Sequence, residues 1–439
     1  MGRRLFGTDG VRGLAGVEIT AQLALALGRA VVLHSALNAP RALVIRDTRE
    51  SGEMLESALA AGIASAGGEV LLGGVMPTPA APLLIRRHGF DLAVVISASH
   101  NLYADNGIKF FGGDGFKLSD QTEREIELHI DEDVGGGGRQ IGRIREMPGT
   151  AEDYLHALET RFAGLSLDGL DVVLDCANGA TFRVAPEIFT RLGAKVTAIA
   201  VTPDGRNIND GCGSTHLQTL AQAVREGGHD LGFAFDGDGD RMLAVDRDGT
   251  LVDGDELLAL AALHLRACNR LVGNGVAVTV MTNFGFHSAM AQAEIEVATT
   301  AVGDRYVLEA LRERGWTLGG EQSGHIIELG FAPSGDGIAS ALLVLEALGG
   351  GDLRRRAAMA KLPQRLVNVS VRDRGALEDA AGVREAVDRE SAALDGRGRV
   401  LVRPSGTEPL VRVMVEAPSD EEADAVCERL VAVVREQLG

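Results

Sequence analysis

The chain carries the same order of strands and helices three times. Strands that alternate with helices of this length predict mainly parallel sheets with right-handed crossovers. The copies recur at roughly a hundred residues, whereas solenoid repeats recur at about 20 to 50, so each copy is expected to form its own α/β domain. The expected strands are 42–45, 68–72, 92–96, 171–175, 194–199, 230–235, 276–280 and 295–299. The expected helices are 20–37, 53–66, 182–192, 217–226, 254–266, 288–293, 306–314 and 338–348.

The last part of the chain follows a different pattern. From residue 362 onward, strands at 366–371, 398–403 and 411–416 accompany helices near 376–394 and 420–437, which predicts a small α+β domain. A chain of 439 residues exceeds the size of one hydrophobic core, so we predict four domains. Their predicted spans are 1–150, 151–249, 250–361 and 362–439. The expected fold class is three similar α/β domains with mixed, mainly parallel sheets, plus a smaller C-terminal α+β domain.

Charge and cysteine content exclude several classes of protein. A net charge of -19 argues against a nucleic-acid-binding protein, because such proteins normally present a basic face. The four cysteines are widely spaced without a Cys-x-x-Cys, which predicts free thiols in a reducing compartment. The N-terminus lacks an apolar signal segment, and the most apolar helix, 20–37, is interrupted by Arg29 and His34. We therefore expect a cytoplasmic protein with no membrane span.

Each copy places a polar cluster that contains or adjoins glycine after its last strand, at 97–101, 236–241 and 319–325. Open α/β sheets bind ligands beyond the carboxyl ends of their strands, so these clusters are candidate sites. Ser99 in the first cluster fits a hydrolase nucleophile, a phosphoryl carrier, or a serine that only caps a turn. His100 is its immediate neighbour and is expected to point elsewhere, and no Gly-x-Ser-x-Gly is present, which argues against the hydrolase.

The second cluster predicts a metal site. In an extended loop, the alternating carboxylates of Asp236, Asp238 and Asp240 can point the same way. Oxygen ligands alone select Mg²⁺, Ca²⁺ or Mn²⁺, and a site that leaves positions open for phosphate oxygens favours Mg²⁺. An EF-hand loop is excluded, because Arg241 and Arg247 occupy the positions that require Gly and Glu. A solvated turn rich in Asp and Gly is the alternative interpretation.

Two further segments are candidates for binding substrate. The first is 403–409 with Arg412, where backbone N–H groups, hydroxyls and guanidinium groups suit a phosphate. The second is the third cluster, in which Glu321 and Ser323 suit hydrogen bonds to sugar hydroxyls. An ordinary turn between strands is the alternative for both segments.

These clusters, in this order, resemble the α-D-phosphohexomutase superfamily, and the resemblance covers nearly the whole chain. It rests on the segments 97–101, 236–241, 320–325 and 403–409. Within the superfamily, the segments 6–13, 209–216 and 303–306, and above all Gln322, are similar to the bacterial branch that acts on glucosamine phosphates. Leu102 and Leu217 stand where that branch usually has proline. Without a proline ring at position 102, we expect a more mobile loop around Ser99.

The resemblance implies an isomerase that interconverts glucosamine 6-phosphate and glucosamine 1-phosphate for amino-sugar and cell-wall synthesis. Ser99 would be phosphorylated and would give its phosphoryl group to O1, and the resulting 1,6-bisphosphate would return its 6-phosphoryl group to Ser99. One Mg²⁺ per subunit would bridge Ser99, Asp236, Asp238 and Asp240, and a sugar 1,6-bisphosphate would prime the enzyme. The four domains would carry, in order, the phosphoserine, the metal, the sugar and the distal phosphate, around a central cleft.

The same resemblance assigns the remaining candidate residues. Arg12 and Arg241 would steady the transferring phosphoryl group. Lys109 would be the general base or acid, with a pKa lowered by burial and nearby cations, unless it only forms an ion pair with a carboxylate. His325 is a second candidate for proton transfer, or else a hydrogen-bonded loop histidine. The sugar-binding residues would be Gly303, Asp304, Arg305, Glu321 and Ser323, and the distal-phosphate residues would be Arg403, Ser405, Gly406, Thr407 and Arg412.

The expected partner is a phosphosugar, with no nucleic acid and no membrane, and the chain is expected to be a monomer or a homodimer. A phosphomannomutase or phosphoglucomutase of the same superfamily shares every chemical part and is the nearest alternative. A non-catalytic sugar-phosphate sensor is the alternative from a different class. The presence of Ser99, the three aspartates and Lys109 argues against the sensor.

Overall fold

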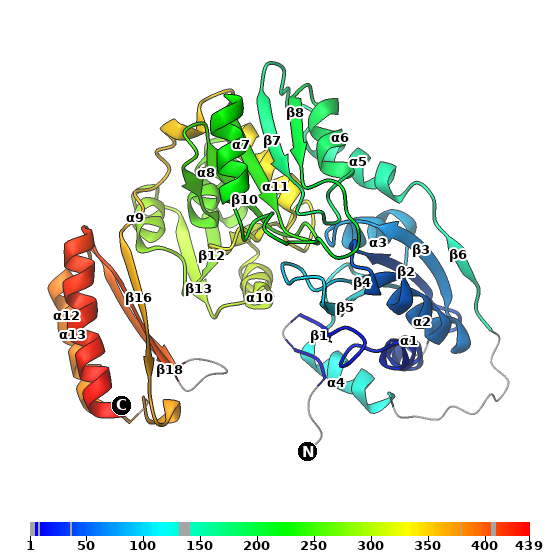
Figure 1. Ribbon diagram of the computed structural model, residues 1–439, viewed down its shortest axis with the longest axis horizontal. Helices are drawn as coiled ribbons and strands as arrows, with labels where there is room; N and C mark the ends of the chain where they lie inside the picture. The colour runs from blue at the N-terminus through cyan, green and yellow to red at the C-terminus, as the bar shows by residue number, and fades with distance from the viewer. Residues whose placement is uncertain (1–4, 8, 36, 131–140, 378, 405–409) are drawn as a thin grey trace. The chain divides into compact units, whose positions relative to one another are not determined.

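The computed structural model describes residues 5–7, 9–35, 37–130, 141–377, 379–404 and 410–439 (Figure 1). The chain forms two compact units, of which one comprises Met1–Met281 with Glu296–Arg356 and the other Thr282–Ile295 with Ala357–Gly439. Among the described helices, none is both long and apolar enough to cross a bilayer. All four cysteines are free, as predicted.

The first unit contains three sheets, and the first sheet has six strands in the order β1-β5-β4-β2-β3-β6. β2 is parallel to both β3 and β4, whereas β5 is antiparallel to β4 and β1 is antiparallel to β5. Apolar faces of α1 and α2 cover buried residues of β2 and β4 such as Val44 and Val94. The strands are β1 (Val11–Leu14), β2 (Arg41–Arg46), β3 (Glu69–Val75), β4 (Leu92–Ile96), β5 (Asp105–Gly112) and β6 (Ile144–Glu146). The helices are α1 (Ala21–Ser35), α2 (Ser51–Ser65), α3 (Ala80–His88), α4 (Asp120–Leu128) and α5 (Thr150–Arg161).

The second sheet has the order β11-β10-β9-β7-β8, and the third has the order β13-β12-β14-β15. β7 is parallel to β8 and β9, and β12 is parallel to β13 and β14. The second sheet and its helices consist of β7 (Asp171–Asp175), α6 (Val184–Arg191), β8 (Lys195–Ile199), α7 (Gln218–Gly227), β9 (Leu231–Phe235), β10 (Met242–Asp246) and β11 (Leu251–Val252). The third sheet and its helices consist of α8 (Gly254–Ala267), β12 (Gly275–Thr279), β13 (Glu296–Thr300), α10 (Asp304–Arg314), β14 (Leu318–Gly320), β15 (Ile326–Glu328) and α11 (Gly337–Leu348).

All three sheets share one arrangement that places the candidate clusters. In each sheet, a candidate cluster follows the last of three parallel strands. The next strand pairs antiparallel with that last strand, as β5 does with β4, β10 with β9 and β15 with β14. Most of the parallel strands match those expected from the sequence, but β14 and β6, which have three residues each, and the return strands were not expected. β15 has only three residues, and β5 carries the charged Lys109 within its buried run, so neither gives a clear apolar run. Each cluster therefore lies in the connection between a parallel strand and its antiparallel return.

The second unit is built on an antiparallel sheet with the order β16-β18-β17. Valines of β18 and one apolar face of α13 form its core, which includes Val413, Val415 and Leu430. α9 belongs to this unit, because Phe284 N–H donates to Glu416 Oε2 at 2.8 Å. The elements are α9 (Phe284–Gln292), β16 (Gln364–Ser370), α12 (Ala381–Leu394), β17 (Arg399–Pro404), β18 (Leu410–Glu416) and α13 (Asp420–Leu438). Three mixed α/β sheets with a smaller antiparallel α+β part are the fold class predicted from the sequence.

Candidate active site

Ser99 lies in the connection between β4 and β5 and is fully buried. β4 is apolar and buried along its whole length, so the polar side chains begin only where the strand ends. The backbone of Ser99 has a φ of 52°, in the left-handed region that non-glycine residues adopt only when the surroundings hold them there. Its Oγ donates to Asp236 Oδ2 at 2.6 Å. The first two candidate clusters, from different sheets, therefore meet at this hydrogen bond.

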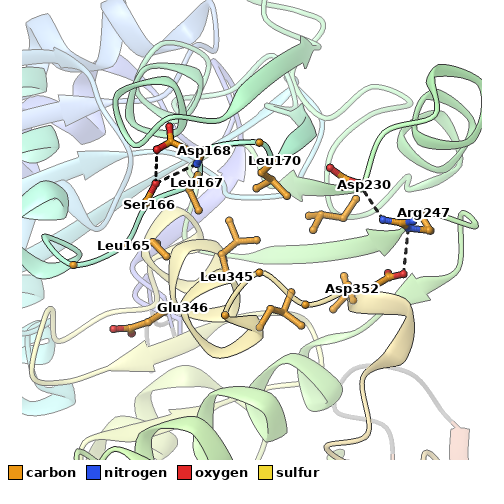
Figure 2. A pocket seen from close by; sticks show the side chains of 18 residues that line it. Leu165, Ser166, Leu167, Asp168, Leu170, Asp230, Arg247, Leu345, Glu346 and Asp352 are labelled. Carbon is orange, nitrogen blue, oxygen red and sulfur yellow. Dashed lines mark hydrogen bonds and ion pairs between the residues drawn. The ribbon is translucent and has the colours of Figure 1, made fainter.

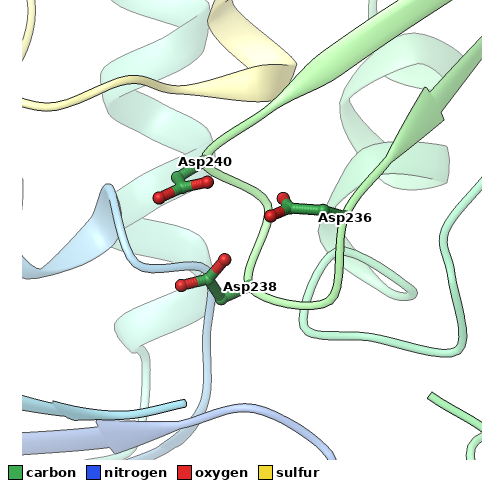
Figure 3. Close-up of side chains that lie close together, drawn as sticks. All are labelled: Asp236, Asp238 and Asp240. Atoms are coloured by element: carbon green, nitrogen blue, oxygen red, sulfur yellow. The ribbon is translucent and has the colours of Figure 1, made fainter. Parts of the chain in front are cut away.

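Asp236, Asp238 and Asp240 lie in the loop between β9 and β10 and are all buried. Each offers one carboxylate oxygen, and these oxygens lie within 4.8 Å of one another (Figure 3). Gly237 permits this packing, because a Cβ there would lie 2.6 Å from the Ser99 carbonyl oxygen. The alternation of Asp and Gly thus brings the carboxylates together, as predicted, and also lets the Ser99 loop approach, which was not predicted.

The donor set fits a hard divalent cation. Asp238 Oδ1 and Asp240 Oδ1 are buried and have no hydrogen-bond partner among the described residues. Burial, together with Asp240 and Asp238 beside it, raises the pKa of Asp236 well above its usual range. Burial alone would also raise the pKa of Asp240, but His325, Lys109 and Arg241 hold it well below its usual range. Carboxylates this close repel one another, and an oxygen-binding cation such as Mg²⁺ would relieve the repulsion.

Lys109 on β5 is buried among carboxylates. Its Nζ lies 2.8 Å from Asp238 Oδ2, 3.1 Å from Asp9 Oδ2 and 4.0 Å from Asp240 Oδ2. Burial alone would lower the pKa of Lys109, but Asp238, Asp9 and Asp240 outweigh it and raise the pKa. The expectation of a lowered pKa was therefore wrong, because it counted neighbouring cations and not the carboxylates. The alternative of an ion pair matches the observed contacts, and the role of Lys109 in proton transfer stays a prediction.

His100 turns toward the site, contrary to the expectation that it would point elsewhere. Its Nδ1 lies 3.5 Å from Ser99 Oγ and accepts from an Arg241 N–H at 3.1 Å. Burial, then Arg241 and Arg12, lower the pKa of His100 to about 4, so the ring is neutral near pH 7. With its Nδ1 lone pair engaged by Arg241, His100 orients the guanidinium and is poorly placed to deprotonate Ser99. The geometry does not support the hydrolase interpretation.

Arg12 and Arg241 approach the site from β1 and from the end of the metal loop. Arg12 forms an ion pair with Asp9, and Arg241 Nε lies 3.8 Å from Asp240 Oδ1. The structure thus brings both predicted guanidinium groups to the carboxylates around Ser99. Their contact with a phosphoryl group stays a prediction.

A closed chain of charged groups joins the three sheets. Lys117 Nζ lies 2.5 Å from both Asp9 Oδ1 and Asp304 Oδ2. His325 Nε2 lies 3.8 Å from Asp304 Oδ2 and its Nδ1 3.6 Å from Asp240 Oδ2. Because Gly335 N–H donates to Nε2 at 3.0 Å, a neutral His325 carries its proton on Nδ1, facing Asp240. This arrangement matches the loop-histidine alternative, and Asp304 contacts Lys117 rather than open solvent.

The third candidate cluster, which contains Glu321 and Ser323, lies between β14 and β15. Gly303 N–H donates to Glu321 Oε1 at 3.1 Å, which joins the start of α10 to this cluster. Ser323 Oγ is buried without a hydrogen-bond partner among the described residues. The Arg305 guanidinium instead reaches α4, where it pairs with Asp120 and with Glu123 at 3.2 Å. The structure therefore brings Gly303 to Glu321, whereas Arg305 is held by α4, and the binding of a sugar by these residues stays a prediction.

The distal-phosphate candidates belong to the second unit. Arg403 and Arg412 are direct cross-strand partners on β17 and β18. Burial, and then Arg412, lower the pKa of Arg403. Like charges placed opposite each other are unfavourable in a sheet unless an anion bridges them, so this pair suits a phosphate. Ser405, Gly406 and Thr407 lie outside the described residues.

Buried polar residues that the motifs do not single out complete the site. Thr78 Oγ1 donates to Asp238 Oδ2 at 2.7 Å, and Asp9 contacts both Lys109 and Lys117. Asp47 and Arg49 follow directly after β2 and lie beneath the Ser99 loop. Thr78, Asp47 and Arg49 all follow the carboxyl ends of parallel strands, so the rule that placed the clusters could also have found them.

A cavity of about 630 Å³ lies elsewhere, between the segment 164–170, the start of β9 and the end of α11 (Figure 2). The charged groups that line it pair with one another, for example Arg247 with Asp230 at 3.0 Å and with Asp352 at 3.3 Å. Its described lining contains no candidate catalytic residue. A second cavity, of about 700 Å³, is lined in part by Lys117, Asp304 and Arg305 and therefore borders the candidate site.

Comparison with known proteins adds independent evidence. Four family models match in chain order, each described as phosphoglucomutase/phosphomannomutase: alpha/beta/alpha domain I (residues 3–134), domain II (152–249), domain III (253–366) and the C-terminal domain (366–433). A phosphoglucosamine mutase of Desulforudis audaxviator is 54% identical over 447 residues, covering 98% of both chains. One of Bacillus subtilis is 46% identical over 445 residues, covering 99% of both.

Solved structures show the same fold. A phosphoglucomutase/phosphomannomutase family protein of Burkholderia thailandensis has a TM-score of 0.82 at 23% identity, covering 99% of this chain and 97% of its own. An N-acetylphosphoglucosamine mutase of Aspergillus fumigatus, solved with GlcNAc-6P and magnesium, has a TM-score of 0.69 at 20% identity, covering 99% and 96%. The chain therefore belongs to the phosphoglucomutase/phosphomannomutase family and, within it, to the phosphoglucosamine mutases.

Proposed function

We propose that the chain interconverts glucosamine 6-phosphate and glucosamine 1-phosphate through a phosphorylated Ser99 and a 1,6-bisphosphate. The observation that carries this proposal is the 2.6 Å hydrogen bond from Ser99 Oγ to Asp236 within the buried aspartate cluster. In one half-reaction the O1–P bond forms as the Ser99 Oγ–P bond breaks. In the other, the Ser99 Oγ–P bond re-forms as the O6–P bond breaks. The proton that O1 gives up in the first half-reaction is matched by the proton that O6 gains in the second. A sugar 1,6-bisphosphate is the proposed source of the first phosphoryl group.

The metal is proposed to be one Mg²⁺, held by Asp236, Asp238, Asp240 and the phosphorylated Ser99. When bound, Mg²⁺ supplies positive charge that offsets the negative charge developing on the transferring phosphoryl oxygens. The buried oxygens Asp238 Oδ1 and Asp240 Oδ1, which lack hydrogen-bond partners among the described residues, support this ligand set.

The protein side chains position and neutralise the reacting groups. Asp236 Oδ2 accepts the Ser99 hydroxyl proton in a hydrogen bond and so fixes the rotamer of the serine. Lys109 is proposed to neutralise Asp238 and Asp9, which limits repulsion of the incoming phosphate, and its role as general acid or base stays a prediction. Arg12 and Arg241 are proposed to contact the transferring group, as preorganised cations stabilise phosphoryl transfer.

Two sets of residues are proposed to recognise the substrate. Glu321 and Ser323, with the nearby Gly303, would bind the sugar, and the buried Ser323 hydroxyl has no other described partner. Arg403 and Arg412, with Ser405, Gly406 and Thr407, would hold the phosphate that is not reacting, and the opposed arginines support this assignment. We further propose that the reaction takes place in the cytoplasm, as the free thiols suggest.

The substrate preference can be tested directly. Rates should be compared on glucosamine 6-phosphate, glucose 6-phosphate and mannose 6-phosphate, with Mg²⁺ and a catalytic amount of a sugar 1,6-bisphosphate. We expect the highest kcat/KM on glucosamine 6-phosphate. A clear preference for mannose 6-phosphate would overturn the assignment.

Ser99→Ala tests the phosphoryl carrier. The variant should fold normally and lose mutase activity, because no hydroxyl remains to carry the group. Intact-mass measurement after incubation with the bisphosphate should show one added phosphate on the parent protein and none on the variant. Ser57→Ala, at an exposed position of α2, is the matched control and should keep both properties.

A further inference from the structure

The carbonyl groups of the Ser99 loop converge on one buried guanidinium group. Arg49 Nη2 donates to Ser99 O at 2.9 Å and to Asn101 O at 2.8 Å. Arg49 Nη1 donates to Asp105 O at 3.0 Å and also to Leu102 O. The side chain of Arg49 is fully buried. A single side chain therefore binds four carbonyl groups of the seven-residue segment 99–105.

Asp47 holds Arg49 and also reaches Ser99 from the other side. Arg49 Nε donates to Asp47 Oδ2 at 2.8 Å, and Arg49 N–H donates to Asp47 Oδ1 at 3.0 Å. Ser97 Oγ donates to Asp47 Oδ2 at 2.6 Å and accepts from Ser99 N–H at 3.0 Å. The N–H and the C=O of Ser99 are thus both tied to the same buried ion pair.

The second sheet adds a further donor through Asn209, which is also buried. Its Nδ2 donates to Ser99 O at 2.9 Å and to Asn101 O at 2.9 Å. Ser99 O and Asn101 O therefore each accept from both Arg49 and Asn209. These bonds offset the cost of holding Ser99 at a φ of 52°.

We infer that Arg49 is a positioning residue that holds the phosphoserine loop through its backbone and does not bind phosphate; this inference rests on the proposed function. A guanidinium group has five N–H donors. In Arg49, one faces Asp47 and the other four face the loop carbonyls, so none is left for a phosphoryl oxygen. The bond to Leu102 O also restrains the residue at which the usual proline is missing.

Lysine cannot replace this arginine, because its ammonium group has three donors and no planar fork. Arg49→Lys keeps the charge and should lower kcat by about 100-fold or more, since a displacement of about 1 Å at a reacting group has that effect. KM for glucosamine 6-phosphate should change by less than about threefold, because Arg49 touches no substrate.

Arg161→Lys is the matched control. Arg161 is also largely buried, and it pairs with Glu328 at 2.8 Å and with Glu346, both of which lie outside the Ser99 loop. Hydrogen exchange of the loop amides, several of which are bonded within the loop, gives a readout that does not depend on activity. Exchange in a peptide covering 97–105 should accelerate in Arg49→Lys and not in Arg161→Lys.

A kcat within threefold of the parent protein in Arg49→Lys, unchanged loop exchange, or an equal loss of kcat in Arg161→Lys would each overturn the inference. Asn209→Ala removes the bonds that Asn209 donates to Ser99 O and Asn101 O, two of the carbonyl groups that Arg49 also binds. If Arg49→Lys does not fold, unchanged kcat and unchanged loop exchange in Asn209→Ala would overturn the inference that these carbonyl bonds position the loop. A parent protein without mutase activity would instead refute the proposed function. The exchange comparison would then still test whether Arg49 holds the loop.

Discussion

At the scale of single residues, the chemistry of Lys109 depends on which carboxylates surround it. Asp238 and Asp240 come from the metal loop, and Asp9 comes from the turn before β1, which reaches Lys109 because β1 pairs with β5. Their combined charge outweighs burial and raises the pKa of Lys109. A lysine in these surroundings stabilises negative charge and donates hydrogen bonds more readily than it accepts a proton.

Substitution of a single residue, Asp240, tests the metal site. Its Oδ1 has no hydrogen-bond partner among the described residues. Asp240→Asn should remove a charged ligand, and it also weakens the ion pairs of Asp240 with His325, Lys109 and Arg241. The Mg²⁺ concentration for half-maximal activity should rise at least about tenfold, as even indirect supports of a metal often contribute that much. EDTA should abolish activity in both proteins, and Mg²⁺ should restore it. Asp248→Asn, at a position 56% exposed, should leave the Mg²⁺ dependence unchanged.

The residues that could be predicted from the sequence are those carried by compact motifs. Ser99 and the three aspartates stand in short segments after apolar strands, and the structure brings them together. The position of Arg49 after a parallel strand could be found in the same way, but the partners of Arg49 and Asp9 could not. Their contacts with the Ser99 loop and with Lys109 arise only when separate strands pair.

At the scale of elements, the apolar parallel strands were predictable, whereas the antiparallel returns were not. The run at β4 is buried throughout, but β15 is too short to be recognised by its pattern. The return strands nevertheless place key groups, because β5 carries Lys109 toward the metal loop. α11 contributes in a similar way, since Gly337 N–H at its start donates to Gly239 O of the metal loop at 2.9 Å.

The N-cap of α11, Asp336, should make the stability of the protein depend on pH. Its carboxylate accepts from Ala339 N–H at 2.9 Å and from the Tyr154 hydroxyl at 3.0 Å. Burial, which outweighs these bonds, raises the pKa of Asp336 from 3.8 to about 6. The native state therefore keeps this proton to a higher pH than the unfolded state, so stability from this group is lost as the pH rises from about 4 through 6.

Asp336→Asn removes this titration. Relative to the parent protein, the variant should gain about 2 to 3 kcal/mol in its free energy of unfolding between pH 4 and pH 7, with no further gain above pH 7. Urea unfolding can be followed by the fluorescence of Trp316, the single tryptophan, which is buried in the same sheet region. A difference between the two proteins that does not change with pH would contradict the prediction.

At the scale of the whole molecule, a set of charged contacts joins the three sheets around the site. Lys117 connects Asp9 beside the first sheet with Asp304 at the start of α10. Burial alone would lower the pKa of Lys117, but Asp304 and Asp9 raise it. Repeated architecture predicts three sheets with equivalent strand ends, but not which cation meets which carboxylate across them. Asp304 and Lys117 are far apart in the chain, and only the packing of the sheets brings them together.

Lys117→Met should therefore destabilise the first unit strongly, because it leaves two largely buried carboxylates without their shared cation. Breaking a buried ion pair in this way costs about 3 to 5 kcal/mol. Asp304→Asn in the same background removes one of the stranded charges, so the double variant should unfold at a higher urea concentration than Lys117→Met alone. If the effects of the two substitutions on the free energy of unfolding are additive, Lys117 and Asp304 do not stabilise each other. A positive coupling would show that the first and third sheets are held at the active site by this buried lysine.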